Sequence, residues 1–288
     1  LSTGNKDNIL PFFDKPNFSF IEGDIRNIED CKKATNGVEF VLHQAALGSV
    51  PRSIKNPRVT NDVNASGFVN MLVAAKNNKV KRFIYATSSS VYGDSEKLPK
   101  KEDEIGRPMS PYAVTKHANE LYASVFSYNY GIETIGLRYF NVFGKRQNPK
   151  GEYSAVIPKF INKLLKLESP TIFGDGKTTR DFTYIDNVVQ ANILSMVTDD
   201  DKAINQVYNI ASGGRFTLIE LVNYLQDYLS EINYKTEGIK INYQDFRIGD
   251  INHSYANIDK AKKLLNYSPK YSFQEGLKQA VKWYSENL

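Results

Sequence analysis

The fold is decided by residues 40–86, which read Phe40-Val-Leu-His-Gln-Ala45, then a helical pattern over residues 63–77, then Phe83-Ile-Tyr-Ala86. Both short runs are almost continuously apolar, as expected of strands whose two faces are covered. A helix between two such strands is the pattern of a βαβ unit, in which the two strands are parallel. The stretch therefore predicts a parallel sheet with helices packed on its faces.

The same alternation extends outward on both sides of this stretch. Before it, residues 18–21 are predicted as a strand and residues 28–35 as a helix. After it, residues 112–130 are predicted as a long helix whose entry suits Pro111, and residues 134–137 as a further strand. We expect a doubly wound α/β sheet domain over residues 1–144.

The character of the sequence changes after Gly144. Glycines and short segments replace the long alternation, and helices are predicted at residues 218–229, 260–265 and 273–284. Asp186 and Thr217 are suitable N-caps for the helices that follow them. We expect residues 145–288 to form a smaller C-terminal α/β lobe, interleaved with the sheet domain near residues 185–210.

The composition excludes several classes of protein. Of the 288 residues, 41% are hydrophobic and 24% are charged, which rules out a disordered chain and a coiled-coil rod. No apolar run approaches the ~18 residues of a membrane span. The first residues lack the basic start and the apolar core of a signal peptide.

Charge and cysteine content narrow the partners further. The chain has 37 Lys and Arg against 32 Asp and Glu, a net charge of +5 that suits small anionic ligands. Its densest cluster of lysines ends at Lys101 and is followed directly by acidic residues, so no nucleic-acid-binding surface is expected. Cys31 is the only cysteine, which excludes an internal disulfide and a cysteine metal site and fits a reducing cytoplasm. No spacing indicates a metal, and His43 is interpreted as a packed core residue.

The sharpest chemical signal is Tyr112-Ala-Val-Thr-Lys116. Residues four apart lie on one face of a helix, about one turn from each other. A lysine ammonium near the phenol is expected to lower the tyrosine pKa from ~10 towards neutrality, which would make Tyr112 a general base. The spacing alone occurs by chance in many helices, so its context decides.

That context is a run of hydroxyl groups. Ser88-Ser-Ser-Val-Tyr-Gly93 follows directly on a strand that is predicted to be buried. Open α/β sheets bind their ligands at the carboxyl ends of parallel strands. The three serines are therefore predicted to line a site.

Further motifs accompany these two in a fixed order. The order is Asp24, His43-Gln-Ala-Ala46, Asn64, Ser88-Ser-Ser-Val-Tyr-Gly93, Tyr112-Ala-Val-Thr-Lys116, Arg138-Tyr-Phe-Asn-Val-Phe-Gly144, Arg180-Asp-Phe-Thr-Tyr-Ile-Asp186 and Phe246-Arg-Ile-Gly-Asp250. In this order they resemble the extended short-chain dehydrogenase/reductases over essentially the whole chain. The resemblance implies a Rossmann-type sheet domain that binds NAD and a C-terminal lobe that binds a sugar nucleotide.

Within that family the chain looks most like the UDP-N-acetylglucosamine 4-epimerases of bacterial polysaccharide and lipopolysaccharide biosynthesis. The loop Ala45-Ala-Leu-Gly-Ser-Val-Pro-Arg-Ser53 carries this likeness. The resemblance implies that Tyr112 removes the proton of the sugar 4-hydroxyl while hydride passes to NAD, and that a 4-keto sugar turns over before the hydride returns. Ser88 would hydrogen-bond the reacting oxygen, and Lys116 would hold the nicotinamide ribose. The implied substrate is a UDP-N-acetylhexosamine or its uronic acid form.

The same resemblance assigns two sets of binding residues. It implies that the cofactor contacts Asp24, Ile25, Gln44, Ala45, Ala46, Asn64, Tyr112, Lys116 and Tyr139. It implies that the UDP-sugar contacts Ser49, Ser89, Ser90, Asn141, Arg180, Arg247, Asp250 and Ser254. Arg180 and Arg247 would neutralise the diphosphate, because guanidinium groups bind phosphate in a bidentate manner. Ser254 is small and would leave room for an acetamido group on the sugar.

Other activities stay open as alternatives. Ser89 and Ser90 supply neither of the carboxylates that similar dehydratases and decarboxylases carry there, so these two activities are demoted. A sugar-nucleotide reductase and a non-catalytic cofactor-binding protein remain. The glycine-rich turn with which the family begins, and which holds the cofactor pyrophosphate, is not in this sequence, so the first βαβ unit is expected to be missing from it. The acid that selects NAD over NADP is likewise not visible, so NAD rests on the resemblance.

A homodimer is also expected. Related enzymes pair two helices per subunit into a four-helix contact, and two-fold dimers are the commonest oligomers. The helices predicted at residues 63–77 and 112–130 carry apolar residues on more than one face. These residues are Met71, Leu72, Leu121, Tyr122, Val125 and Phe126.

Overall fold

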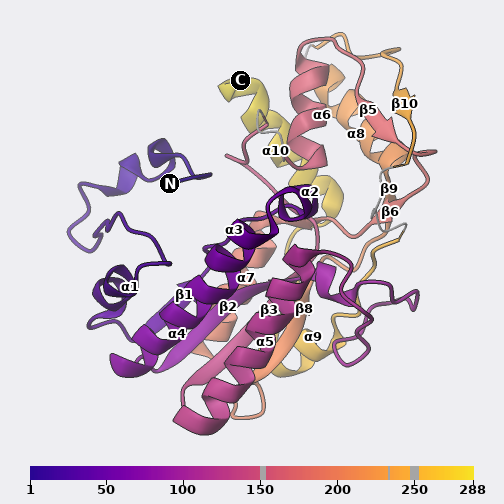
Figure 1. Cartoon of the computed structure of the whole chain (residues 1–288). Coiled ribbons are helices and arrows are strands. Elements are labelled where there is room, and N and C mark those ends of the chain that lie inside the picture. Colours follow the sequence, from indigo (N-terminus) through magenta and orange to yellow (C-terminus); the bar gives the residue numbers. More distant parts are fainter. Residues whose placement is uncertain (150–153, 233, 247–252) are drawn as a thin grey trace.

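A four-stranded parallel sheet lies at the centre of the larger half of the molecule (Figure 1). The computed structural model describes residues 1–149, 154–232, 234–246 and 253–288. The strands lie in the order β1-β2-β3-β8. Their bounds are Phe40–His43, Arg82–Ser88, Glu133–Tyr139 and Gln206–Ile210. The predicted doubly wound α/β fold is confirmed.

The register of the sheet aligns the ends of its inner strands. Ser88 at the end of β2 pairs with Tyr139 on β3, and Tyr139 pairs with Ile210 on β8. The central strand β2 is buried along almost its whole length, as the continuous apolar run predicted. The last residues of β2, β3 and β8 therefore form one row at the carboxyl edge of the sheet.

Helices cover both faces of the sheet (Figure 1). The helices α4 (Gly67–Asn77) and α5 (Pro111–Tyr130) pack on one face, and α7 (Ile185–Val197) and α9 (Asp259–Leu265) pack on the other. Each face buries its own hydrophobic cluster. On the first face, further helical segments lie at the edge: α1 (Ile28–Thr35), α2 (Val50–Lys55), α3 (Pro57–Asn61) and the π-helical turn η3 (Asp62–Ser66).

The smaller lobe has a hydrophobic cluster of its own, formed chiefly by three helices. These are α6 (Val156–Leu165), α8 (Leu218–Glu231) and α10 (Phe273–Asn287). Three two-stranded sheets, separate from the central one, accompany these helices. Parallel pairs join β4 (Val142–Phe143) to β7 (Thr183–Tyr184) and β5 (Thr171–Phe173) to β10 (Asn242–Gln244), and an antiparallel pair joins β6 (Thr179–Arg180) to β9 (Phe216–Thr217).

Local capping explains where the main helices begin. Pro111 occupies the first turn of α5 after the N-cap Ser110, and Gly131 ends this helix in a left-handed conformation, as such residues favour. Thr217 caps α8 as predicted, in a reciprocal capping box with Glu220. The prediction for Asp186 is wrong. Asp186 lies inside the first turn of α7, where its negative charge interacts favourably with the helix dipole. The N-cap position is Tyr184.

Residues 18–21 do not form the predicted strand. A strand needs a hydrogen-bonded neighbour, and no described segment pairs with them. Their aromatic side chains instead pack within the N-terminal segment, with Phe18 and Phe20 against Phe12 and Phe13. The prediction of a strand over residues 18–21 is therefore wrong.

One buried arginine fixes a helix at the opposite edge of the sheet. Arg82 begins β2 and is only 2% exposed. Its guanidinium binds Glu133 at 2.7 Å and donates to the carbonyl oxygens of Ser195, Met196 and Thr198 at 3.0, 2.9 and 2.8 Å. The last carbonyls of a helix lack partners within it, so Arg82 acts as a C-terminal cap for α7.

Candidate active site

Tyr112 and Lys116 lie together at the start of α5, under the carboxyl edge of the sheet. The Lys116 ammonium nitrogen is 5.9 Å from the centroid of the Tyr112 ring. Lys116 is 3% exposed and donates to the carbonyl oxygen of Ala86 at 2.8 Å. Among the described residues this is the only hydrogen bond of its ammonium, so two of its three N–H donors remain for a ligand.

The expected lowering of the Tyr112 pKa is not found. Burial raises the pKa of Tyr112, and a hydrogen bond from Ser88 opposes that rise. Burial is thus the main cause. Lys116 does not offset it: its ammonium is directed at a backbone carbonyl, and its own burial lowers the pKa of Lys116 to about 8. Tyr112 is therefore a neutral phenol in this structure.

The hydroxyl of Ser88 is placed by a sharp turn after β2. Ser88 is the N-cap of the short helix η4 (Ser89–Tyr92). Its oxygen accepts from the backbone N–H of Ser90 at 3.2 Å and from the Ser90 hydroxyl at 3.0 Å. With its acceptor capacity used by Ser90, the Ser88 proton is directed to Tyr112. Ser89 and Ser90 are half-buried in the same turn.

A buried ion pair supports this group from behind. Glu120, one turn after Lys116, receives two hydrogen bonds from Arg138 at 2.9 and 2.8 Å and one from Thr87 at 2.6 Å. The Glu120 carboxylate opposes the lowering of the Lys116 pKa. Both partners of the pair are almost completely buried. The carboxylate nearest to Lys116 along α5 is therefore held in place by contacts within the sheet domain.

His43 is a core residue, as expected. Its ring stacks on Phe83 and meets Phe68 edge-on, with centroids 5.5 and 5.4 Å away. Burial, together with the positive charge of Lys116, lowers the pKa of His43 to about 3. It is neutral at physiological pH and provides an apolar wall.

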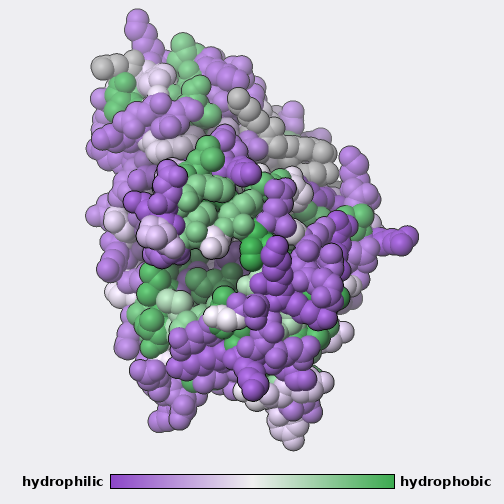
Figure 2. All heavy atoms as spheres, turned by 90° about the vertical axis from the view of Figure 1, so that its left-hand side faces the viewer, coloured by the Kyte–Doolittle hydropathy of each residue, from purple (hydrophilic) through white to green (hydrophobic). Residues whose placement is uncertain are grey.

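Four of the nine predicted cofactor residues line a hollow beside β1. A pocket of about 320 Å³ is lined there by Asp24, Ile25, Gln44 and Ala45, together with Leu42. Figure 2 shows a recess with hydrophobic residues around it on this side of the molecule. Asp24 binds Arg26 through both carboxylate oxygens, which lowers the pKa of Asp24 to about 2. A mixed apolar and acidic hollow fits the adenosine half of a dinucleotide.

Gln44 and Tyr139 are joined by a residue that the sequence did not indicate. The Tyr139 hydroxyl lies 3.1 Å from the Gln44 side-chain oxygen and accepts from the side-chain nitrogen of Asn192 at 2.9 Å. Asn192 also accepts from the Gln44 amide at 3.1 Å. It comes from the middle of α7, and no motif marks it. The network fixes the end of β1 relative to β3.

Asn64 holds the loop that follows β1. Its side chain accepts from the Leu47 N–H at 2.7 Å and donates to the Leu47 carbonyl at 3.0 Å. It is buried, and it reaches Thr115 on α5 at 3.4 Å. Ala46 lies within this loop, and Ser49 ends it with a φ of 90° and caps α2. Asn64 is thus engaged with the protein backbone in this structure.

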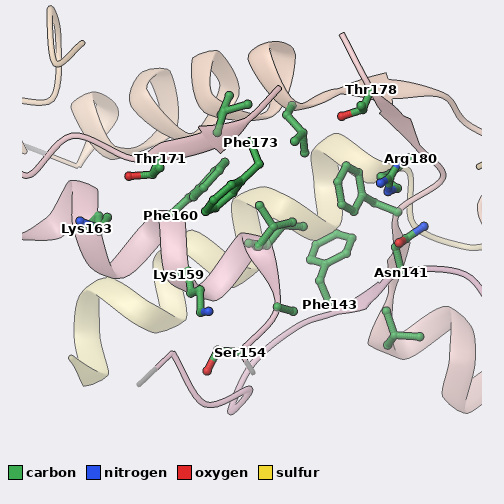
Figure 3. Close-up of a pocket in the computed structure, with 17 residues that line it drawn as sticks. Asn141, Phe143, Ser154, Lys159, Phe160, Lys163, Thr171, Phe173, Thr178 and Arg180 are labelled. Atoms are coloured by element: carbon green, nitrogen blue, oxygen red, sulfur yellow. The ribbon is translucent and has the colours of Figure 1, made fainter. Parts of the chain in front are cut away.

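A second pocket, of about 370 Å³, lies in the C-terminal lobe. Asn141 and Arg180 lie at one end and Lys159 and Lys163 come from α6 on the other side (Figure 3). Asn141 has a φ of 37° and donates to the Asp181 carbonyl at 3.0 Å. The lining also includes Lys159, Lys163 and Phe173, which no sequence motif marked. The two lysines lie four apart beside apolar residues, a signal that could have located this helix face.

Of the remaining predicted substrate residues, Ser254 lies beside β6. Ser254 is half-buried, and its backbone N–H donates to the Thr179 carbonyl at 3.0 Å. The neighbouring His253 binds the Thr179 hydroxyl through its Nδ1 atom at 2.9 Å. Arg247 and Asp250 lie outside the described residues. Within the described ranges no three His, Cys, Asp or Glu side chains gather to hold a metal ion, and no helix is long and apolar enough to cross a membrane.

The family described as "NAD dependent epimerase/dehydratase" matches residues 2–211, well over half of the chain. The chain belongs to that family. The resemblance drawn from the motifs is confirmed, and NAD is the cofactor.

Individual relatives of this NAD dependent epimerase/dehydratase chain carry related names. A putative UDP-glucose 4-epimerase of Methanocaldococcus jannaschii is 37% identical, over 100% of this chain and 89% of that protein. The solved UDP-N-acetylglucosamine 4-epimerase of Methanobrevibacter ruminantium, in complex with UDP-N-acetylmuramic acid, has a TM-score of 0.92 at 39% identity and covers 100% and 89% of the two chains.

A third relative is the UDP-glucuronic acid 4-epimerase of Bacillus cereus with UDP-glucuronic acid and NAD. It has a TM-score of 0.89 at 31% identity and covers 98% of this chain and 86% of that chain. The comparisons support a UDP-sugar 4-epimerase that uses NAD, while the relatives differ in the sugar.

Proposed function

We propose that the chain catalyses the NAD-dependent 4-epimerisation of a UDP-N-acetylhexosamine through a 4-keto sugar. The observation that carries this proposal is the contact of Ser88, Tyr112 and Lys116 at the carboxyl edge of the parallel sheet. Tyr112 is placed to move the proton of the sugar hydroxyl. Ser88 and Lys116 are placed to control the charge of the Tyr112 oxygen.

The protein groups divide the proton chemistry among them. Tyr112, as phenolate, takes the proton of the sugar 4-hydroxyl, and as phenol it returns that proton when the alcohol re-forms. Ser88 donates a hydrogen bond to the Tyr112 oxygen, which favours the phenolate. Lys116 contributes positive charge from the next helical turn. When bound, NAD exchanges a hydride with the sugar carbon and brings a further positive charge that favours the phenolate.

The residues present fit this cofactor. Lys116 keeps two unused N–H donors, which suit the vicinal hydroxyl groups of a ribose. The hollow lined by Asp24, Ile25 and Gln44 suits the adenosine half. These residues bind and orient the group, and the buried Glu120–Arg138 pair keeps Lys116 in place behind it.

The pocket of the C-terminal lobe is proposed to take the nucleoside diphosphate. Arg180, Lys159 and Lys163 supply cationic donors around it, and Phe173 offers an aromatic surface for a base. Titration calorimetry with UDP tests this assignment. Replacement of Arg180 by Met should weaken binding at least ~10-fold, whereas an unchanged affinity would contradict it.

Ser254 is proposed to select the acetamido sugar. It is small, and its segment runs beside Thr179, next to Arg180. A bulky side chain there would collide with a substituent on C2, because packed pockets do not absorb extra atoms without strain. Ser254→Tyr should abolish turnover of UDP-N-acetylglucosamine and spare UDP-glucose, while Ser254→Ala should leave both unchanged. Equal loss on both substrates would overturn the assignment.

A reductase remains the second candidate, because its chemistry needs the same Tyr–Lys pair. An epimerase regenerates its nicotinamide in each cycle, whereas a reductase consumes NADH. Turnover of UDP-N-acetylglucosamine without a change in absorbance from NADH would favour the epimerase. A chain that binds no labelled NAD in equilibrium dialysis would favour a non-catalytic role.

The proposed homodimer uses the outer face of α5. Leu121, Tyr122 and Val125 are exposed there, whereas Met71, Leu72 and Phe126 are buried against the sheet. The six residues therefore divide into an outer and an inner set. Light scattering at micromolar concentration should give twice the mass of the chain, and Leu121→Lys should shift it to a monomer. A wild-type monomer would reject the dimer.

A further inference from the structure

Asp181 is a carboxylate enclosed in the C-terminal half without an ionic partner. It follows Arg180 directly and is 0% exposed. No arginine, lysine or histidine forms a salt bridge with it among the described residues. A buried charge without an ion pair is costly and is normally avoided. Its retention beside a predicted diphosphate ligand calls for a role.

Its hydrogen bonds come from the backbones of two separate segments. Asp181 Oδ1 accepts from the Ser212 N–H at 3.1 Å, and Oδ2 accepts from the Ala256 N–H at 3.4 Å. The N–H groups of Gly213 and Gly214 also favour its charged form. Both oxygens are therefore engaged as acceptors.

These contacts tie together the pieces that carry the substrate residues. Asp181 continues β6, which bears Arg180, and its own carbonyl accepts from Asn141. Ala256 lies two residues after Ser254, whose N–H binds Thr179 on the same strand. The carboxylate is the point at which three chain segments meet, 31 and 75 residues apart in sequence.

We propose that Asp181 is a positioning residue of the substrate site, an inference that rests on the proposed UDP-sugar function. Its ionised carboxylate holds the loop 212–214 and the segment 253–256 against β6, and so fixes the spacing between Arg180 and Ser254. A protonated carboxyl has a donor in place of one lone pair and so accepts fewer hydrogen bonds from these backbone N–H groups. The site then loses its fixed spacing.

The ionisation of Asp181 falls in an accessible range. Burial raises the pKa of Asp181 to about 7, and the backbone hydrogen bonds oppose the rise. Because the pKa in the folded chain exceeds that in the unfolded chain, protonation of this group stabilises the fold as the pH falls through 7. Weaker binding at low pH is therefore not explained by unfolding through Asp181. The charged and titratable groups on the surrounding elements are Arg180, Arg215, His253, Tyr267 and Lys100.

The experiment measures binding and turnover of UDP-N-acetylglucosamine by the wild-type chain and by Asp181→Asn. The amide keeps the size of the side chain but can accept on one side only. We expect KM and Kd to rise at least ~10-fold with kcat within about threefold, because the proton chemistry lies on α5. Asp186→Asn, an exposed aspartate five residues further on, is the matched control and should bind as the wild type does.

A pH series supplies a readout that a merely structural role would not move. For the wild type, Kd should rise as the pH falls from 8 to 5.5, whereas Asp181→Asn should be flat at the weaker value. The diphosphate diester stays ionised throughout, so the ligand does not titrate. Circular dichroism checks that both chains are folded at each pH.

Each outcome decides a separate question. A wild-type chain that binds neither UDP nor UDP-N-acetylglucosamine refutes the proposed function and the role of Asp181 with it. Binding by Asp181→Asn that equals the wild type overturns the inference alone. The same holds if the pH dependence persists in that variant and disappears in His253→Gln. An Asp181→Asn chain that does not fold leaves the wild-type pH series to decide, and a flat series overturns the proposal.

Discussion

Glu120 and Asp181 are both buried carboxylates, yet the two halves of the molecule treat them differently. In the sheet domain Glu120 has a guanidinium partner in Arg138 and a hydroxyl partner in Thr87. In the substrate lobe Asp181 has only backbone N–H partners, and its pKa rises to about 7. The first acid is therefore held by an ion pair, whereas the second is held by the backbone alone and can change its charge state near neutral pH.

The difference indicates how the two halves divide the work. The catalytic pair needs a constant charge environment, because Tyr112 and Lys116 act on a proton. The substrate segments need to be held together without a rigid core, because they come from loops between short strands. Backbone hydrogen bonds to one carboxylate achieve this with few residues.

The largest expected effect tests the buried ion pair of Glu120 with Arg138. Arg138→Met leaves Glu120 buried without its partner and should lower the free energy of unfolding by about 3–5 kcal/mol. Urea unfolding followed by circular dichroism measures the change. Lys278→Met is the matched control, because its pair with Glu231 is exposed, and its free energy of unfolding should change far less. Equal losses of unfolding free energy in the two variants would show that the buried ion pair contributes no more than an exposed one.

Loss of the catalytic hydroxyl is the next largest effect. Tyr112→Phe removes one oxygen from a helix face and should lower kcat by at least ~10² while the fold is kept. Tyr128→Phe makes the same change at a 90% exposed position of the same helix and should be neutral. Turnover of UDP-N-acetylglucosamine measures both, and wild-type turnover by Tyr112→Phe would refute the base.

The pH dependence of stability separates the two halves further. His43 is neutral in the fold with a pKa of about 3, so unfolded chains take up its proton first as the pH falls below ~6.5. Its contribution to stability is complete above ~6.5 and is lost towards pH 3. Between pH 7 and 5 the wild type should lose about 1–2 kcal/mol more than His43→Leu, as measured by urea midpoints.

Asp181 contributes with the opposite sign in the same range, but it is present in both chains and cancels in this difference. Parallel stability curves for the wild type and His43→Leu would show that His43 is not held neutral by the core.

The smallest expected effect tests whether the stability of the C-terminal lobe influences substrate binding. Thr217→Ala removes the capping box of α8 and should lower the free energy of unfolding by about 1 kcal/mol with KM unchanged. Ser272→Ala removes the corresponding box of α10 and should cost about as much. Asp181→Asn is expected to raise KM. If Thr217→Ala raised KM as much, the position of the substrate segments would depend on the overall stability of the lobe and not on Asp181.

The sequence predicted the elements whose signals are local. The helix at residues 28–35 has the predicted bounds, and α5 begins one residue before the predicted start because Pro111 occupies its first turn. The Tyr112–Lys116 proximity follows directly from helical periodicity and is confirmed. Such features depend on neighbours within a few residues.

Features that depend on distant partners were missed. Residues 18–21 have the composition of a strand, but strand formation is decided by a pairing segment. No motif marks Asn192, and Asp181 was quoted within the Arg180–Asp186 motif without a role of its own. The contacts of these two residues become visible only in the fold, because they have partners that lie 31 to 75 residues away in sequence. The Tyr112 pKa was predicted with the wrong sign because spacing says nothing about burial.

The cap that Arg82 provides for α7 bears on the order in which the chain folds during its synthesis. Its carbonyl partners lie 113 to 116 residues further along, so at 5–20 residues per second they emerge roughly 5–25 s after Arg82 does. During that time the guanidinium has no helix end to bind, and its hydration opposes burial of the start of β2. We therefore expect burial of the start of β2 to become favourable only once α7 has been synthesised.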